Sequence, residues 1–123
     1  MILLTPELRE RLLANGRQPE IDHVPVVKFF NPIGIGVWLA TELEPDGDTL
    51  FGLADLGEPE LGAFSLAELT RLRLPLGLGI ERDLLFDGMV AISVWADTAR
   101  EARSIRAAEQ LLYRAYRTRE RNA

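Results

Sequence analysis

The tightest constraint on the fold is the short stretch Glu44–Asp48, which joins two apolar segments. Residues 36–43 and residues 49–56 on either side of it are predicted to be β-strands, because apolar residues alternate along them. Asp46-Gly47, inside the stretch, is one of the strongest short signals for a hairpin turn. A connection this short excludes the crossover that parallel strands need, so the sequence predicts an antiparallel pair.

Further segments extend this pair into a meander. Residues 24–32 are rich in β-branched and aromatic residues and predict a strand that ends at Asn31-Pro32. A tight turn at 57–60 leads to a strand at 61–65. Residues 72–86 alternate almost strictly, and their Pro and Gly residues disfavour a helix, so a strand is predicted there. Residues 89–95 predict another strand.

Two helices are signalled by their first residues. Thr5 is a suitable N-cap for a helix over residues 5–16, because proline is favoured at the first helical position that follows it. Ser65 and Glu68 have the spacing of a capping box and predict a short helix after the fourth strand.

A third, longer helix is predicted over residues 97–119. Its first turn contains Thr98 and Glu101, which have the spacing of a second capping box. Six arginines of this segment fall within an arc of about 120° on a helix of 3.6 residues per turn. They are Arg100, Arg103, Arg106, Arg114, Arg117 and Arg121. This stripe has three interpretations: a solvated face, a contact surface for phosphate or an acidic protein, or a surface packed on the acidic body of its own chain or of a dimer mate.

These elements predict an α+β fold: an antiparallel five- or six-stranded sheet with an N-terminal helix, a short middle helix and a long C-terminal helix. The charge changes along the chain, because residues 1–96 hold seven Lys/Arg against 15 Asp/Glu, whereas residues 97–123 hold seven Arg against four Asp/Glu. We therefore expect an α+β core domain over residues 1–96 and a separable arginine-rich helix over residues 97–123.

Composition excludes several chemistries. The 123 residues contain no cysteine and one histidine, His23, so disulfides, thiolate zinc sites and cysteine nucleophiles are excluded. The sequence contains no apolar run of the roughly 18 residues that a membrane span needs. We expect a cytoplasmic protein that uses no cofactor, holds no metal and does not contact a membrane.

The charged triplet Glu81-Arg82-Asp83 interrupts the alternation of residues 72–86. Arg82 falls in the row of leucines, whereas Glu81 and Asp83 fall on the polar side. An arginine in an apolar row either extends its charge to solvent or is buried with a carboxylate. We expect a half-buried or buried Arg82 paired with a carboxylate; a ligand-binding role and a catalytic role are the alternatives.

Four groups of residues suggest a family. They are LLTPELRERLLANG at 3–16, VVKFFNP with VWLATEL at 26–43, LFGLADLGEPELGAFSLAEL at 50–69 and PLGLGIERDLLF at 75–86. In order and spacing the chain resembles, over residues 1–87, the small bacterial proteins of domain of unknown function 2958. The resemblance implies a protein encoded on a plasmid or other mobile element and implies no activity. Its pattern includes Asp55, Glu60, Ser65, Glu68, Glu81, Arg82 and Asp83, and we expect the chain to depart from it after Phe86.

The function expected from these observations is that of a non-enzymatic accessory protein of a bacterial mobile element, which binds a protein partner or a second copy of itself. Binding of nucleic acid through the arginine stripe is an alternative, and so is a small-molecule or metal-dependent enzyme that uses the triplet. The candidate binding residues are Glu81, Arg82, Asp83, Arg100, Arg103, Arg106, Arg114 and Arg117.

Overall fold

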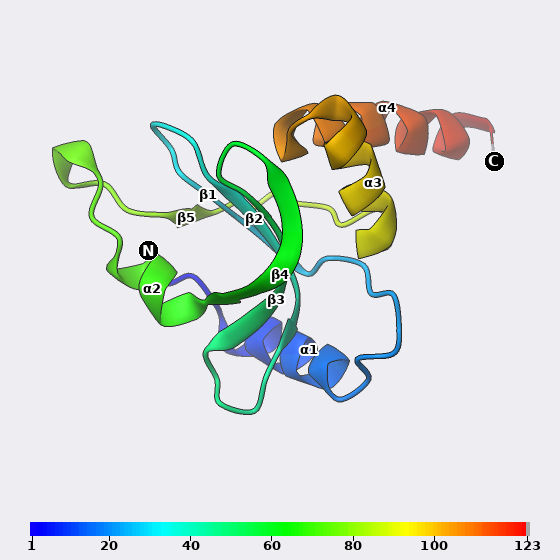
Figure 1. Ribbon diagram of the computed structural model, residues 1–123. Coiled ribbons are helices and arrows are strands. Elements are labelled where there is room, and N and C mark those ends of the chain that lie inside the picture. The colour runs from blue at the N-terminus through cyan, green and yellow to red at the C-terminus, as the bar shows by residue number, and fades with distance from the viewer. Residues whose placement is uncertain (123) are drawn as a thin grey trace.

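The computed structural model describes residues 1–122, and the side chains of residues 1–119. Its five-stranded sheet is antiparallel throughout and has the order β4-β3-β2-β1-β5 (Figure 1). The strands are β1 (Val27–Phe30), β2 (Val37–Leu43), β3 (Thr49–Asp55), β4 (Pro59–Ser65) and β5 (Glu81–Arg82). The predicted α+β class and the antiparallel meander are confirmed.

Helices flank the sheet on both sides. In the described part of the chain they are α1 (Pro6–Gly16), α2 (Leu66–Arg71), α3 (Ile92–Ala102) and α4 (Ile105–Asn122), with one 3₁₀ turn, η1 (Pro75–Gly77). The predicted caps of the first two helices are confirmed, because Thr5 Oγ1 accepts the N–H of Leu8 and Ser65 Oγ accepts the N–H of Glu68.

The hydrophobic core has two parts, one on each face of the sheet. α1 covers one face, where Leu12, Phe29 and Leu43 are buried together. α3 and α4 lie over the opposite face, where Leu39 and Leu53 are buried in a second cluster (Figure 1). The sheet is therefore the middle of three layers, which explains why β2 is apolar on both faces.

A β-bulge at Thr41 assigns the residues of β2 to these two faces. Leu39 points to the second cluster, whereas Leu43, four residues later and beyond the bulge, points to the first. Gly52 pairs with Ala40 beside the bulge. A Cβ atom on Gly52 would lie 1.8 Å from the carbonyl oxygen of Leu39, so only glycine fits this close approach.

The strand predicted over residues 72–86 is wrong except at β5. The chain leaves the sheet after α2 and forms a loop closed by a hydrogen bond of 2.9 Å from the N–H of Leu74 to the carbonyl of Leu78. Leu76, at the tip, has a left-handed backbone (φ 65°) and is fully exposed to solvent. Only Glu81–Arg82 pairs with β1, which is itself four residues long. The alternation of residues 72–86 predicted a long strand, but β1 is too short to pair with more than a small part of that segment.

The strand predicted over residues 89–95 is also wrong, because α3 begins at Ile92. Ile92, Trp95 and Ala99 follow helical spacing and are buried in the second cluster. Ala91, the N-cap residue, makes no side-chain capping bond. Asp22 performs that role from a distant loop, since its carboxylate accepts the N–H of Ser93 at 3.1 Å. The capping box predicted at Thr98 and Glu101 lies instead inside α3.

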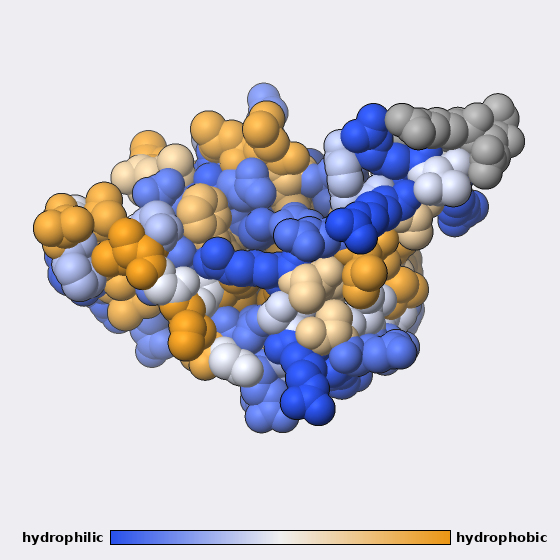
Figure 2. Space-filling view, turned by 90° about the horizontal axis from the view of Figure 1, so that it is seen from above, coloured by the Kyte–Doolittle hydropathy of each residue, from blue (hydrophilic) through white to orange (hydrophobic). Residues whose placement is uncertain are grey.

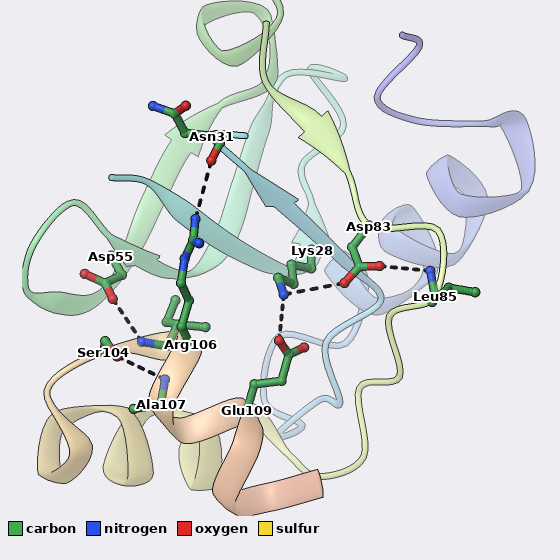
Figure 3. A network of polar contacts seen from close by, with 10 residues as sticks. Lys28, Asn31, Asp55, Asp83, Leu85, Ser104, Arg106, Ala107 and Glu109 are labelled. Carbon is green, nitrogen blue, oxygen red and sulfur yellow. Dashed lines mark hydrogen bonds and ion pairs between the residues drawn. The ribbon is translucent and has the colours of Figure 1, made fainter. Parts of the chain in front are cut away.

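The single helix predicted over residues 97–119 is divided in two. α3 ends at Ala102, and the left-handed backbone (φ 72°) of the next residue, Arg103, terminates the helix. Ser104 then caps α4, because its Oγ accepts the N–H of Ala107 at 3.0 Å. A second distant carboxylate, that of Asp55, accepts the N–H of Ile105 at 2.9 Å (Figure 3).

The boundary expected between residues 96 and 97 falls inside α3 and inside the second core cluster. Ala96 lies before the boundary, and Ala99, Ile105 and Ala108 lie after it, yet all four are buried in that cluster. The separability of residues 97–123 stays a prediction for truncation to test, and this burial argues against it.

Candidate functional site

A surface groove of about 610 Å³ lies beside β5, between the N-terminal segment and α4. It brings together the predicted triplet and one arginine of the predicted stripe. Its lining residues are Met1, Lys28, Phe30, Glu81, Arg82, Asp83, Leu84, Leu85 and Arg106. Four of the eight predicted binding residues therefore line one groove, and we take this groove as the candidate functional site.

Arg82 is half-buried, as predicted, but its predicted carboxylate partner is wrong. Its Nη1 donates to the carbonyl oxygens of Ile2 at 3.1 Å and Leu3 at 2.8 Å. Its main-chain N–H points to Met1 Sδ at 3.1 Å. The carbonyls of residues 2 and 3 lie outside any helix or strand and need donors, and the guanidinium group carries several. Arg82 thus fastens the start of the chain to β5.

Asp83 belongs to a different set of contacts, centred on Lys28 (Figure 3). Lys28 Nζ lies 2.6 Å from Glu109 Oε1 on α4 and 3.4 Å from Asp83 Oδ2. The Lys28 side chain is 12% exposed, and those of Asp83 and Glu109 are 27% and 28% exposed. Two carboxylates on one ammonium group compensate its partial burial and tie α4 to the sheet.

Lys28 is the charged residue of the groove that the sequence analysis missed, and the apolar residues Leu84 and Leu85 were not predicted either. Lys28 is the only lysine of a chain that otherwise uses arginine, and it occupies a polar position in an apolar strand segment. That isolated position is the signal that could have identified it. Its partners could not be identified in the same way, because Glu109 is 81 residues away in the sequence.

Arg106 approaches the same groove from α4. Its Nη2 lies 3.4 Å from the carbonyl oxygen of Asn31, at the β1–β2 turn (Figure 3). The same atom lies 3.5 Å from the carbonyl oxygen of Gly34. These are long, weak contacts with main-chain acceptors. Arg106 also lines a second hollow of about 320 Å³, which it shares with Asp55, Arg103 and Ser104.

The remaining predicted arginines lie elsewhere, because the break at residues 103 and 104 interrupts the stripe. Arg100 and Arg103 line a separate pocket of about 550 Å³ against the β3–β4 turn, with Glu58 and Glu60. Arg100 makes an exposed ion pair with Asp97 at 3.5 Å, a type of contact that contributes little to stability.

Arg114 and Arg117 are exposed on the second half of α4. Figure 2 shows that this part of the helix projects from the body and carries hydrophilic side chains. The Arg117 guanidinium lies 5.5 Å from the ring centre of Tyr113, within the range of a cation–π contact. Arg121 lies outside the residues whose side chains are described.

Apolar side chains gather at the rim of the groove. Leu84 is 70% exposed and Leu85 is 92% exposed, and the adjoining N-terminal residues Met1 and Ile2 are 69% and 78% exposed. All four adjoin Arg82, which contacts Met1 and Ile2 directly. Within the described residues, no group of three or more His, Cys, Asp or Glu side chains is placed to hold a metal ion. The groove therefore offers apolar contact area together with two arginine side chains, Arg82 and Arg106, that contact main-chain carbonyls.

The fold and the groove define a small α+β protein with a five-stranded antiparallel sheet between α1 and the α3–α4 pair, and with a partly apolar surface groove at the β5 edge. The family model described as "Protein of unknown function (DUF2958)" matches residues 3–106, and the chain belongs to this family. The match continues well beyond Phe86, where the sequence analysis expected it to end, and it includes all of α3.

No curated protein and no solved structure matches the chain. Among the described residues, none of the helices combines the length and the apolar character that crossing a membrane requires.

Proposed function

We propose that this protein binds a partner protein through the groove beside β5. The partner that the groove fits presents an apolar side chain together with a carboxylate. The observation that carries the proposal is the exposure of Leu84 and Leu85 at the rim of a groove that also contains Arg82 and Arg106. Clustered exposed apolar residues with a polar rim are typical of protein-interaction sites.

Hydrogen bonds hold the two leucines in place. The N–H of Asp83 donates to the carbonyl of Lys28 at 2.9 Å, which continues the pairing of β5 with β1. The side-chain carboxylate of Asp83 accepts the N–H of Leu85 at 2.9 Å. The main-chain carbonyl of Asp83 accepts the N–H of Phe86 at 3.4 Å. A segment fixed in this way loses little conformational entropy on binding, so its apolar contacts contribute more to affinity.

Arg82 and Arg106 are the groups of the groove that favour a carboxylate from the partner. Lys28 is already neutralised by Asp83 and Glu109. Within the described part of the chain, Arg82 and Arg106 contact main-chain carbonyls rather than carboxylates. Arginine binds carboxylates in a bidentate geometry, so a partner carboxylate at this position would complete the contacts of either guanidinium group.

The wider role that we propose is that of an accessory protein of a bacterial mobile element, located in the cytoplasm. This context is supported by the sequence resemblance and not by the groove. The triplet lines one groove, but adjacent strand residues point to opposite faces, so Glu81 and Arg82 approach it from different sides of the sheet. Arg82 lies opposite Phe29 on the α1 side, whereas Glu81 lies opposite Phe30 on the α4 side.

A selection from a library of linear peptides displayed on phage tests the proposal. Peptides that combine apolar and acidic residues should be enriched, and their synthetic forms should bind in fluorescence polarisation. Leu85→Ser and Arg106→Gln should each weaken binding about tenfold. Leu56→Ser is the matched control, because Leu56 is 66% exposed but lies outside the groove.

Circular dichroism melting of each variant separates loss of binding from loss of folding. Enrichment of no peptide would contradict the proposal. So would peptides whose binding is unchanged by Leu85→Ser and Arg106→Gln.

Nucleic-acid binding is a second candidate function, and the exposure of Arg114 and Arg117 favours it. Two phosphate contacts on duplex DNA would give a slope of about −2 in a plot of log affinity against log salt concentration. Arg114→Gln combined with Arg117→Gln should abolish such binding. No binding to duplex DNA at low ionic strength would remove this candidate.

A further inference from the structure

The β4 strand forms one edge of the sheet, and its hydrogen-bonding pattern can be deduced from its register. The N–H of Leu66 donates to the carbonyl of Asp48, and the β3–β4 register continues from there without a bulge. Hydrogen-bonded pairs alternate along an antiparallel ladder. The main chains of residues 60, 62 and 64 therefore bond to β3, and those of Leu61 and Ala63 face away from the sheet.

This edge has few of the features that usually protect an exposed strand. Lysine is absent from β4, and its one proline, Pro59, is the first residue of the strand. Among the described residues, none bonds to the outward main-chain groups of Leu61 and Ala63. A Cβ atom added to Gly62 would meet open space. Strand edges of this kind are templates for pairing with another strand.

The side chains beside the edge are apolar. Leu61 on β4 and Phe51 on β3 are each 38% exposed, and both point to the face that α3 and α4 cover farther along the sheet. Ala63 lies opposite Phe51 in the β3–β4 register and is also exposed. An added strand would therefore cover apolar side chains as well as satisfy main-chain groups.

We propose that a second copy of this chain pairs with β4 in antiparallel orientation, with the two-fold axis at Gly62. Leu61 of each copy then exchanges both main-chain hydrogen bonds with Ala63 of the other. The two five-stranded sheets become one continuous sheet. The proposal concerns the edge of the sheet opposite the groove beside β5, and it does not depend on the function proposed for that groove.

A second copy fits this edge because the strand is complementary to itself about Gly62. In this register Glu60, the only charged residue of β4, lies opposite Phe64 and not opposite its own copy. Centring the pair on Leu61 would place Ala63 opposite Pro59, which has no N–H to donate. Gly62 at the axis also removes any side-chain collision where the two strands approach most closely.

A cysteine variant tests the register directly, because the natural chain contains no cysteine. Residues at a non-hydrogen-bonded antiparallel pair have Cα atoms about 4.5 Å apart, within the range of about 4.4–6.8 Å that a disulfide spans. Gly62→Cys should therefore form a disulfide-linked dimer under mild oxidation. Glu60→Cys and Leu56→Cys are the controls, because in this register neither residue faces its own copy, and both should link far more slowly.

Sedimentation equilibrium of the full chain gives an independent measurement. The natural protein should dimerise with increasing concentration, and Ala63→Pro should raise the dissociation constant of the dimer about tenfold or more, since it removes two intermolecular hydrogen bonds. Ala63→Ser is the matched control and should dimerise normally. The N–H of Ala63 does not bond to β3, so thermal melting of Ala63→Pro should show an intact fold.

Rapid linking of Gly62→Cys together with weakened dimerisation of Ala63→Pro would support the proposal. A natural chain that stays monomeric up to millimolar concentration would overturn it. A dimer that Ala63→Pro leaves unchanged, or that links Leu56→Cys as fast as Gly62→Cys, would also overturn it by placing the contact on another surface.

Discussion

The carboxylate of Asp55, at the end of β3, accepts the main-chain N–H of Ile105, at the start of α4, at 2.9 Å. Its other oxygen accepts the N–H of Gly57 at 2.9 Å, so both oxygens of this buried group are satisfied. A negative charge at a helix N-terminus is favourable because of the helix dipole. Asp55 therefore connects the β3–β4 turn to α4.

We predict that Asp55→Ala lowers the free energy of unfolding by about 2–3 kcal/mol, because it leaves the buried N–H of Ile105 without an acceptor. Asp55→Asn should lose less, since its amide oxygen still accepts one bond. Urea denaturation measures both values. Asp97→Ala is the control, with a side chain that is 83% exposed, and should change stability by less than about 0.5 kcal/mol. Equal effects at the two aspartates would contradict the assignment.

Arg82→Ala should lower the free energy of unfolding by about 1–3 kcal/mol through loss of the bonds to the carbonyls of Ile2 and Leu3. This is less than the roughly 3–5 kcal/mol expected for breaking a buried ion pair. Chemical denaturation gives the value, and hydrogen exchange should show faster exchange at the start of the chain. Arg73→Ala, at an exposed arginine outside the groove, should leave both measurements unchanged.

A chain truncated after Asp97 should aggregate or unfold, because it lacks Ala99, Ile105 and Ala108, which are buried against the sheet. Size-exclusion chromatography and circular dichroism measure the outcome. A chain ending at Arg119 keeps all of these residues and should fold normally. A soluble, cooperatively melting product of the shorter truncation would instead support the separable helix expected from the change in charge.

The pKa of Asp46 is held below its usual range by hydrogen bonds from the Thr49 hydroxyl and from the main-chain N–H groups of Thr49 and Asp48. A carboxyl group with a lowered folded pKa stabilises the fold above its unfolded pKa, and this contribution is lost as pH falls through the folded value. NMR titration of the Asp46 carboxyl should show the lowered pKa. Thr49→Val should move it towards the usual range, and an unchanged value would contradict this cause.

Elements encoded by neighbouring residues were predictable from the sequence. The hairpin at Asp46-Gly47 and the cap at Ser65 depend on side chains within a few positions of the backbone they bind. The start of α3 was not predictable, because Val90, Ile92 and Val94 alternate like a strand while its capping carboxylate comes from Asp22. Two distant aspartates, Asp22 in a loop and Asp55 at the end of β3, thus cap the two helices that the sequence analysis misplaced.

The sequence predicted the charged triplet and Arg106 as separate candidates and did not predict that they line one groove. The partners of Arg82 are carbonyls about 80 residues earlier, and Lys28 meets Glu109 across 81 residues. No local pattern encodes contacts of that range, since they arise only after the sheet has brought the segments together. The alternation does predict that Arg82 and Asp83 lie on opposite sides of the segment, and in the structure they have different partners: carbonyls near the N-terminus for Arg82 and Lys28 for Asp83.

The placement of α3 and α4 has a consequence for synthesis on the ribosome. The meander from β1 to β4 joins neighbours in sequence, and such local topologies form quickly. The face with Leu39 and Leu53 is covered mainly by residues 86–112, the last of the core to emerge. Nascent chains therefore pass through an interval in which half of the sheet is bare, and we expect chaperone binding to be strongest at that stage.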